Sequence, residues 1–401
     1  MNTFLTLTDI TYECARVLVN NLVMAKYVNR EYDDRFAKSG AKIGDTTNLR
    51  LPVRNTVSDG STLVIQDDTE TSTPLRLDKR KHIGFAYTKE DQLLRMDDFS
   101  KRFIAPKVAT LANQVDADVL ALGKKVWNSV GTPGTTPNSS STYLSAGVKL
   151  DDNSAPQDED RFLVVPSQNH ATLVAAEQAL FNSREEISKQ YRKGRIGTAH
   201  GFNWYMDQNC YTHTFGTHSG TPLVKGAGQT GSSLITDGWT SGGCTLNEGD
   251  VFTIADVYGV NPQSYQSTGK LQQFRVTSQI SDTTGDMTIA IEPEIIVSGP
   301  FQTVNALPAD NAPITMYGAT GAVSPQGLAF HRDAFALVMA DLPEPGGGAS
   351  FKRVSDKQLG ISILLTEQFD IVNFRTIVRM DILYGVAAYR PQLACRVWSG
   401  A

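Results

Sequence analysis

The stretch LNEGDVFTIADV (246–257) decides the fold class, because it joins a turn to a strand where the chain shows no helical periodicity. Two further strand-like runs follow, LQQFRVTSQI (271–280) and MTIAIEPEI (287–295), with the turn signal TTGD between them. Gly, Thr and Ser dominate from about Gly216 to about Gly321. Short strands separated by turns are typical of a small barrel or sandwich. The sequence therefore predicts an all-β module here.

The segments on both sides of this module mix helix and strand. RFLVVPSQ (161–168) is predicted to be a buried strand that ends at Pro166, and residues 169–193 are predicted to be helix. Beyond the module, the apolar spacing in SPQGLAFHRDAFALVMADL (324–342) predicts another helix. The all-β module is thus expected as an insertion, and the fold class is α+β.

The clearest helix lies in the first half of the chain. Its apolar residues recur three or four positions apart, as one face of an α-helix requires; they are Val108, Leu111, Ala112, Val115, Val119, Leu122 and Val126. We expect this helix at 97–127, after a shorter one at 88–96. At 1.5 Å per residue it would span about 40 Å. Residues 131–160 are expected to be loop.

Residues 46–87 predict an extended two-stranded arm, because LRLPV (49–53) and LRLDKRKHIGFAY (75–87) both alternate apolar and polar residues. An isolated hairpin is marginally stable in water, so the arm is expected to pack on another surface, such as a second subunit. Its basic run KRKH (79–82) is more typical of a solvated or intersubunit face than of a nucleic-acid site. Alternation at 374–382 predicts a further strand near the end of the chain.

The composition is typical of a folded soluble protein. Among 401 residues, 37 Lys and Arg stand against 42 Asp and Glu, a net charge of −5, and 40% are hydrophobic. This chain lacks the surplus of positive charge that general nucleic-acid binding needs. Its longest apolar run, 382–389, is too short for a membrane helix, and no secretory signal is expected at the start. Four widely separated cysteines favour synthesis in a reducing cytosol over a disulfide framework.

Three patterns suggest chemistry, and each has a simpler explanation. GAGQTG (226–231) matches GxGxxG, but it lies in a β-rich zone rather than between a strand and a helix, so a loop is predicted. Cys210, His213 and His218 lack the two paired ligand sets of a structural zinc site. The acidic residues of 151–160 lack the ligand pattern of a calcium loop. No catalytic motif is present, so we expect no enzyme activity, no cofactor and no metal.

The N-terminal segment, from Thr8 to about Asp34, has apolar residues at helical spacing. Asp9 and Glu13 lie four positions apart and share one face of the expected helix. Two explanations remain open: a solvated stripe favoured by the helix dipole, or a docking face for a basic partner. Spacing alone favours the solvated stripe.

Four phrases, taken together in this order, resemble a known family. They are QYRKGRIGTAHGFNWYMDQN (190–209), LNEGDVFTIADV (246–257), LAFHRDAFALVMADLP (328–343) and ILYGVAAYRPQLACRV (382–397). With the order of elements, they make the chain similar to major coat proteins of tailed double-stranded DNA bacteriophages with the Hong Kong 97-type capsid fold. The resemblance is greatest to the subgroup typified by the coat protein of a short-tailed Salmonella phage, which carries an inserted β domain.

The resemblance implies a name for each part of the chain. The parts are an N-terminal arm (1–40), an extended loop (41–92), a spine helix with part of a peripheral domain (93–149), an axial domain (150–221 and 324–350), an inserted β-barrel-like domain (222–323) and peripheral strands (351–401). The implied function is that of a major capsid protein, whose pentamers and hexamers form the icosahedral shell around phage DNA. The implied location is the virion, after assembly in the bacterial cytoplasm.

The family also implies partners. Copies of the chain bind one another, a scaffolding protein guides assembly, and a portal ring occupies one vertex. Packaged DNA would lie against the inner face without sequence-specific binding, and no membrane would be involved. In the typified coat protein, acidic residues of the N-terminal arm meet a basic helix of scaffolding protein. The matching positions here are Asp9 and Glu13.

Two alternative functions are compatible with parts of the pattern. An encapsulin-like nanocompartment would use the same shell fold to enclose an enzyme, but the inserted β module argues against it. A glycan-processing enzyme with a β accessory module would stay monomeric and hold paired carboxylates in a concave site.

Overall fold

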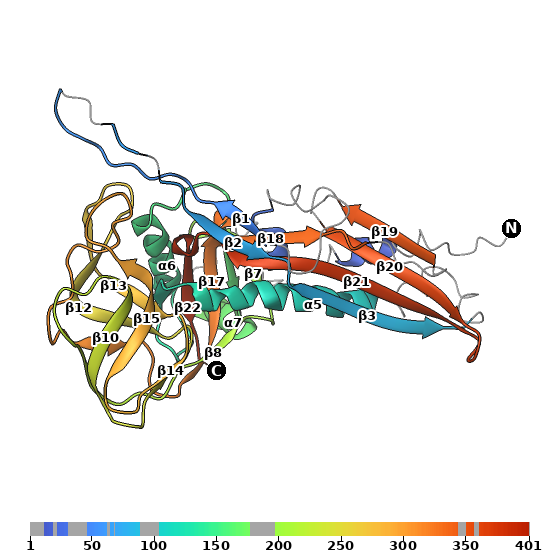
Figure 1. Ribbon diagram of the computed structural model, residues 1–401. Helices are drawn as coiled ribbons and strands as arrows, with labels where there is room; N and C mark the ends of the chain where they lie inside the picture. Colours follow the sequence, from blue (N-terminus) through green and yellow to red (C-terminus); the bar gives the residue numbers. More distant parts are fainter. Residues whose placement is uncertain are drawn as a thin grey trace. The chain divides into compact units, whose positions relative to one another are not determined.

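The computed structural model describes residues 12–18, 22–30, 46–61, 65–67, 69–88, 104–176, 197–343, 350–356 and 361–400. Figure 1 shows the order of their helices and strands. The contacts divide the chain into unit 1 (1–50, 72–119 and 335–389) and unit 2 (51–71, 120–334 and 390–401). The short helix expected at 88–96 lies almost wholly outside the described residues, as do Asp9 and residues 177–193.

An antiparallel sheet forms the larger part of unit 1. Its strands are β3 (Lys79–Tyr87), β18 (Phe335–Ala340), β19 (Ser350–Asp356), β20 (Ile361–Asp370) and β21 (Arg375–Ala388). The strand β21 pairs with β18, β20 and β3 along its length. The predicted alternation is confirmed from Arg375 to Met380, where Thr376, Val378 and Met380 are buried and Arg375, Ile377 and Arg379 are exposed; it ends at Asp381, which was expected on the outer face and is buried. Phe374 is the exception, because it lies in the exposed turn before the strand.

The predicted two-stranded arm is partly confirmed. β1 (Thr46–Arg50) and β2 (Ser72–Arg76) pair antiparallel, with Thr46 opposite Arg76. The run 75–87 is not one strand, however. It breaks at 77–78, and β3 then pairs with β21 instead of β1. Alternation continues across the break, which is why the sequence pattern did not reveal it.

Helix α5 (Ala105–Leu120) confirms the predicted apolar face, since Val108, Ala112 and Val115 are buried. The helix ends earlier than expected and continues as a 3₁₀ helix, Ala121–Lys125. Gly123 lies in this turn, and glycine is a poor helix former. Lys79 and the hydroxyl of Tyr384 both reach Asp118 on α5, at 3.2 Å and 2.6 Å, so the helix packs along β3 and β21.

A buried carboxylate on α5 binds the N-terminal segment of unit 1. Asp116 is 1% exposed and accepts hydrogen bonds from the backbone N–H groups of Val23 (2.7 Å) and Ala25 (2.8 Å). These amides flank the start of the 3₁₀ helix Met24–Lys26, where backbone donors have no partner within the helix. Asn29 then bridges to Ala336 of β18. Asp116 therefore fixes where the chain between residues 22 and 30 runs.

We predict that Asp116→Ala lowers the free energy of unfolding by about 2–4 kcal/mol, because two buried N–H groups lose their acceptors. Hydrogen exchange at Val23 and Ala25 should accelerate with it, and this exchange is the measurement. Thr110→Ala, on the exposed side of the same helix, is the control and should leave both amides protected. Unchanged exchange in the Asp116 variant would contradict the assignment.

The first layer of unit 2 is a mixed sheet in the order β4-β22-β17-β5-β7-β6. Its strands are β4 (Ser129–Val130), β5 (Arg161–Val165), β6 (Thr198–Ala199), β7 (Phe202–Met206), β17 (Val323–His331) and β22 (Ala394–Trp398). The strand predicted at 161–168 is confirmed as β5, and helix α7 (Ser167–Ala176) follows it directly. Helix α6 (Ser140–Asp152) packs against β22 and β4.

Two secondary-structure predictions were wrong. The segment 324–342 is not a helix: β17, a 3₁₀ turn (Arg332–Ala334) and β18 occupy it. Strands buried on both faces read as a continuous apolar run, and such a run does not distinguish strand from helix. Residues 131–160 are not all loop, because α6 lies within them. Ser139 caps α6 by accepting a hydrogen bond from Ser141 N at 3.2 Å. Its polar composition hid this helix.

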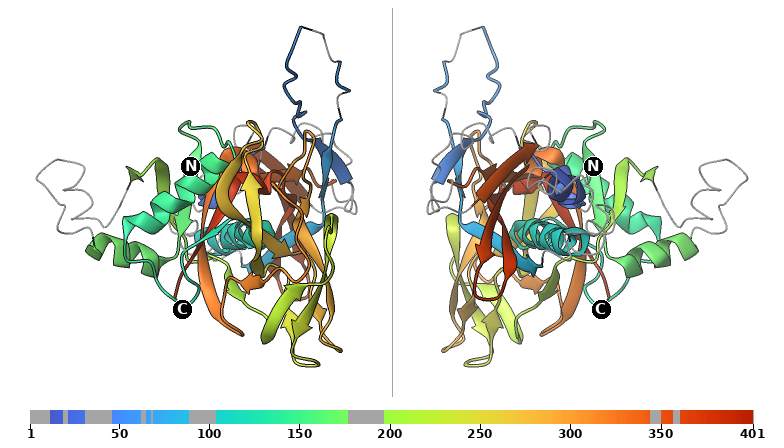
Figure 2. Two further views of the ribbon diagram at one scale, coloured as in Figure 1. Left: turned by 90° about the vertical axis from the view of Figure 1, so that its left-hand side faces the viewer. Right: turned by 90° about the vertical axis from the view of Figure 1, so that its right-hand side faces the viewer.

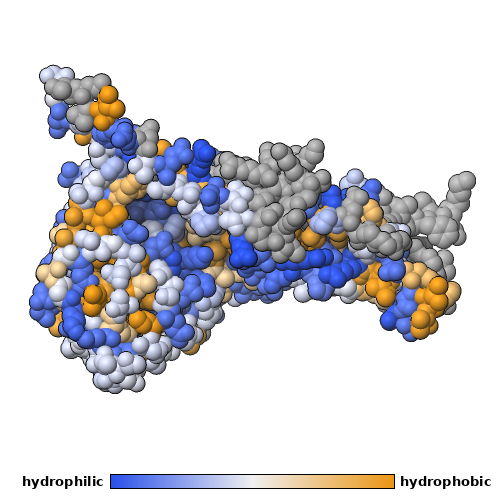
Figure 3. Space-filling model, viewed as in Figure 1, coloured by the Kyte–Doolittle hydropathy of each residue, from blue (hydrophilic) through white to orange (hydrophobic). Residues whose placement is uncertain are grey.

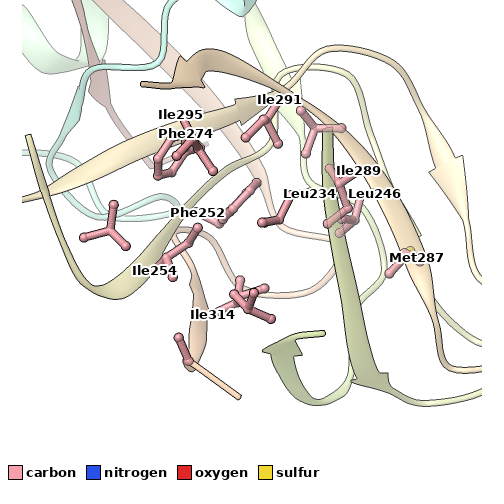
Figure 4. Close-up of a cluster of buried hydrophobic side chains, with 14 of the residues drawn as sticks. Leu234, Leu246, Phe252, Ile254, Phe274, Met287, Ile289, Ile291, Ile295 and Ile314 are labelled. Carbon is pink, nitrogen blue, oxygen red and sulfur yellow. The ribbon is translucent and has the colours of Figure 1, made fainter. Parts of the chain in front are cut away.

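The predicted all-β module is confirmed as a six-stranded barrel. The sheet order is β16-β12-β13-β15-β10-β9, and a bridge between Leu223 and Pro313 joins the two ends. The strands are β9 (Gly220–Val224), β10 (Gly231–Trp239), β12 (Val251–Val260), β13 (Ser267–Val276), β15 (Met287–Ile295) and β16 (Ile314–Met316). Figure 4 shows the apolar core inside, with Phe252, Phe274 and Ile289 fully buried. The predicted loop GAGQTG connects β9 to β10.

The barrel is joined to the first sheet of unit 2 where the chain enters and leaves the barrel. β8 (Thr212–Thr214) pairs antiparallel with the first residues of β17, placing His213 opposite Ser324. Phe215 N also donates to Ala322 O at 2.9 Å. Both ends of the insertion therefore lie side by side on one strand of the first sheet.

Candidate assembly surfaces

A buried polar cluster stands at the base of the barrel. Asp250, fully buried at the start of β12, lies 2.8 Å from His213 Nε2. It also accepts hydrogen bonds from the backbone N–H groups of Gly216 (3.1 Å) and Asn247 (2.8 Å). One carboxylate thus connects β8, the turn that follows it and the turn before β12. This use of His213 was not visible in the sequence, because the partners lie 37 residues apart.

A buried arginine completes this cluster from the other side. Arg396 on β22 donates to Gly249 O at 2.9 Å, and its guanidinium carbon lies 5.0 Å from the ring centre of Trp398. Burial, and then the neighbouring Arg275, lower the pKa of the Arg396 guanidinium. The ring of Trp398 lies 5.7 Å from that of His213. The cluster thus links Gly249 and Asp250, just before β12, to β8 and β22.

The ligand set considered for zinc is not assembled. His218 contacts the carbonyl oxygen of Gly216 at 3.3 Å, and burial raises the pKa of the Cys210 thiol. Among the described residues, no group of three His, Cys, Asp or Glu side chains is placed to hold a metal ion.

We predict that Asp250→Ala lowers the free energy of unfolding by about 3–5 kcal/mol, because it leaves His213 and two backbone donors buried without their acceptor. The control is Asp286→Ala, which removes only an exposed ion pair with Lys225 on the same barrel and should change stability by less than about 1 kcal/mol. Thermal unfolding of both variants is the measurement. Equal melting temperatures for the two would show that the cluster does not support the barrel.

The arm contacts the barrel through residues near the base of the arm, and it carries exposed apolar residues at its tip. Tyr265 donates from its hydroxyl to Asn55 O at 3.1 Å, and Arg54 lies 5.9 Å from the ring centre of Phe301. These residues line a cavity of about 1020 Å³. Val57 and Ile65 are 93% and 84% exposed. Figures 1 and 2 show residues 51–61 and 65–67 extending away from the barrel strands.

The basic run of β3 is paired within unit 1. Lys79 and Lys81 face Asp118 at 3.2 Å and 4.0 Å, and Arg80 lies 3.2 Å from Asp381. Since acidic side chains neutralise much of this charge, the run is not an open basic patch.

Of the two candidate scaffold-binding residues, the structure describes only Glu13. Glu13 lies in the helical turn 12–18 and forms a two-point ion pair with Arg16, at 2.6 Å and 2.9 Å. This bond raises the pKa of Arg16. Asp9 lies outside the described residues, so the structure does not place the two carboxylates together. The sequence analysis missed the pairing of Glu13 with Arg16, although their i,i+3 spacing indicates it.

Comparison with known proteins identifies the family. The family model described as "P22 coat protein - gene protein 5" matches residues 12–397. The chain belongs to this coat protein family. It is therefore a major capsid protein, which forms the icosahedral shell of a phage, and it is located in the virion. The inserted barrel and the two-stranded arm agree with the expected Hong Kong 97-type fold with an inserted domain.

Several solved structures are similar to this coat protein. A Mycobacterium phage Che8 chain is 16% identical, with 94% of this chain and 90% of that chain covered, at a TM-score of 0.46. The capsid of cyanophage P-SCSP1u gives 12% identity, coverage of 94% and 88%, and a TM-score of 0.46. The CUS-3 coat protein I-domain is 26% identical over 24% of this chain and 94% of its own, at a TM-score of 0.19. Family membership rests on the family model.

Two further findings complete the comparison. No curated protein matches the chain. Within the described ranges, no helix is both long and apolar enough to cross a membrane.

Proposed function

We propose that this coat protein assembles as pentamers and hexamers around packaged double-stranded DNA, with a portal ring at one vertex. The match of residues 12–397 to the coat protein family is the observation that carries this proposal. The net charge of −5 supports an inner wall that encloses DNA without binding it tightly. Negative staining of purified particles tests the capsomers: five- and six-fold clusters are expected, and particles without them would contradict the proposal.

We also propose that a scaffolding protein binds the N-terminal segment through Asp9 and Glu13. The exposed ion pair between Glu13 and Arg16 adds a condition, because a basic partner has to compete with Arg16 for the carboxylate. Replacing Arg16 by a basic group of the partner costs little free energy, since an ion pair of this exposure contributes little to stability.

The double variant Asp9→Lys/Glu13→Lys is expected to weaken scaffold binding at least about tenfold, because two attractive charges become repulsive. Co-sedimentation of the purified monomer with scaffolding protein measures this, and circular dichroism shows whether the monomer stays folded. Arg16→Ala is the matched control: it removes the competing ion pair with Glu13 and should bind scaffold as well as or better than the unaltered chain. Normal scaffold-directed shells from the double variant would refute the proposal.

We further propose the domain assignment given by the family resemblance, with the inserted domain at 222–323 between the two parts of the axial domain. The closed barrel and its own apolar core support an insertion that is stable by itself. The adjacent strands β8 and β17 support an end near Val323 and a start between Thr214 and Gly220, earlier than 222, because residue 222 lies within β9.

A fragment of residues 216–325 is therefore expected to fold alone. Its two ends lie next to each other, so cutting the chain there does not interrupt a strand of the barrel. Cooperative thermal unfolding and dispersed amide resonances are the measurements. A random-coil spectrum at all temperatures would contradict the boundary.

A further inference from the structure

A cavity of about 1020 Å³ lies within unit 2, between the base of the arm and the barrel. The arm contributes residues 51–55 to its lining, and the barrel contributes residues 290–294 of β15 together with Phe301. In Figure 3, apolar and hydrophilic surface lie side by side where the arm meets the barrel. Ligand pockets of about 300–1,000 Å³ hold organic molecules, so this cavity is larger than a single inorganic ion needs.

Hydrogen bonds fix the walls of the cavity before any ligand binds. Thr56 N donates to Gln66 Oε1 at 2.9 Å, which joins the two sides of the arm. The hydroxyl of Tyr265, in the turn between β12 and β13, lies 3.1 Å from Asn55 O and 3.4 Å from Pro300 O. The base of the arm is thus tied to two loops of the barrel. A preformed site loses little conformational entropy on binding.

Two arginines line the cavity, and neither pairs with a carboxylate among the described residues. Arg54 belongs to the arm, and Arg390 follows β21. The guanidinium carbon of Arg54 lies 5.9 Å from the ring centre of Phe301. Burial, and then the positive charge of Arg390, lower the pKa of Arg54. The two positive charges therefore act on each other, and an anion placed between them would offset their repulsion.

The acidic residues of the lining do not cancel this charge. Glu292 forms an ion pair with Arg275 of β13, so it is already neutralised. Glu294 is exposed and carries one negative charge, against the two positive charges of Arg54 and Arg390. The lining keeps an excess of positive charge, which favours an anionic ligand.

We propose that this cavity binds a small organic phosphate of the nucleoside monophosphate class, with its phosphate group between Arg54 and Arg390. A guanidinium presents planar pairs of N–H donors that match the oxygens of a phosphate. The amide side chains of Gln263 and Gln392 are available for the polar atoms of a sugar or base. An apolar wall accommodates the organic body of the ligand; it is formed by Pro52, Val53, Pro293, Ile296 and Phe301.

A ligand bound here joins the arm to the barrel, because Arg54 lies on the arm and Phe301 on the barrel. Opening of the arm base then requires the ligand to leave, so binding stabilises the closed base by mass action. With adenosine monophosphate at one hundred times its Kd, the N–H of Thr56 should exchange at least about tenfold more slowly than without it. Unchanged exchange at Thr56 at this concentration would contradict binding in the cavity.

Calorimetric titration of the full-length monomer with adenosine monophosphate tests the site. One saturable site is expected, and Arg54→Gln and Arg390→Gln should each weaken binding at least about tenfold, because each removes charge-assisted hydrogen bonds to the phosphate. Neither variant should lower the melting temperature, since each removes one of two neighbouring like charges. Arg332→Gln is the control, because Arg332 pairs with Asp160 outside the cavity, and its binding should be unchanged. Absence of saturable binding, or equal weakening in all three variants, would overturn the proposal.

Two further probes separate the phosphate from the organic body. Inorganic phosphate lacks the body, and adenosine lacks the charge, so each should bind at least about tenfold more weakly than adenosine monophosphate. Equal affinity for inorganic phosphate would contradict an organic ligand. Equal affinity for adenosine would show that the two arginines do not hold the phosphate.

Discussion

Strand β17 pairs with three other strands along its length, and the arrangement of unit 2 depends on these pairings. Its first residues pair with β8, and its later residues lie between β22 and β5. The same strand therefore pairs with the segment that leads into the barrel and also lies at the centre of the first sheet. Packing is tight at Gly327, where an added Cβ would lie 3.0 Å from Val164 O.

The cluster of Asp250, His213 and Arg396 adds specificity to the connection between the barrel and the first sheet. Buried charges contribute little net stability compared with apolar packing, but they permit few alternative arrangements, because each needs its partner in place. Asp250 binds donors from both sides of the junction, and Arg396 reaches Gly249 from β22. We infer that this cluster fixes how the barrel joins the first sheet, while the barrel core supplies the stability.

The sequence predicted those features that local patterns encode. The barrel strands were recognised because turns separate short alternating runs, and α5 because its apolar residues recur at helical spacing. Helix α6 was missed, since it buries only Tyr143, Ala146 and Leu150, and Ser and Thr make up much of its first half. The strands β17 and β18 were mistaken for a helix because both of their faces are buried. Contacts between distant residues, such as Asp116 with Val23, leave no local signal.

Some candidate assembly surfaces were likewise visible in the sequence, and others were not. The resemblance to coat proteins indicated Asp9 and Glu13, and the alternation within 46–87 indicated the arm. The exposed turn 371–374 gave no signal of its own, because IVNF reads like any other part of a strand until the fold places it in a turn.

Cryo-electron microscopy of the coat protein produced together with its scaffolding protein tests this account most directly. The account predicts closed icosahedral particles in which each subunit carries the barrel. Monomers or open aggregates would contradict it.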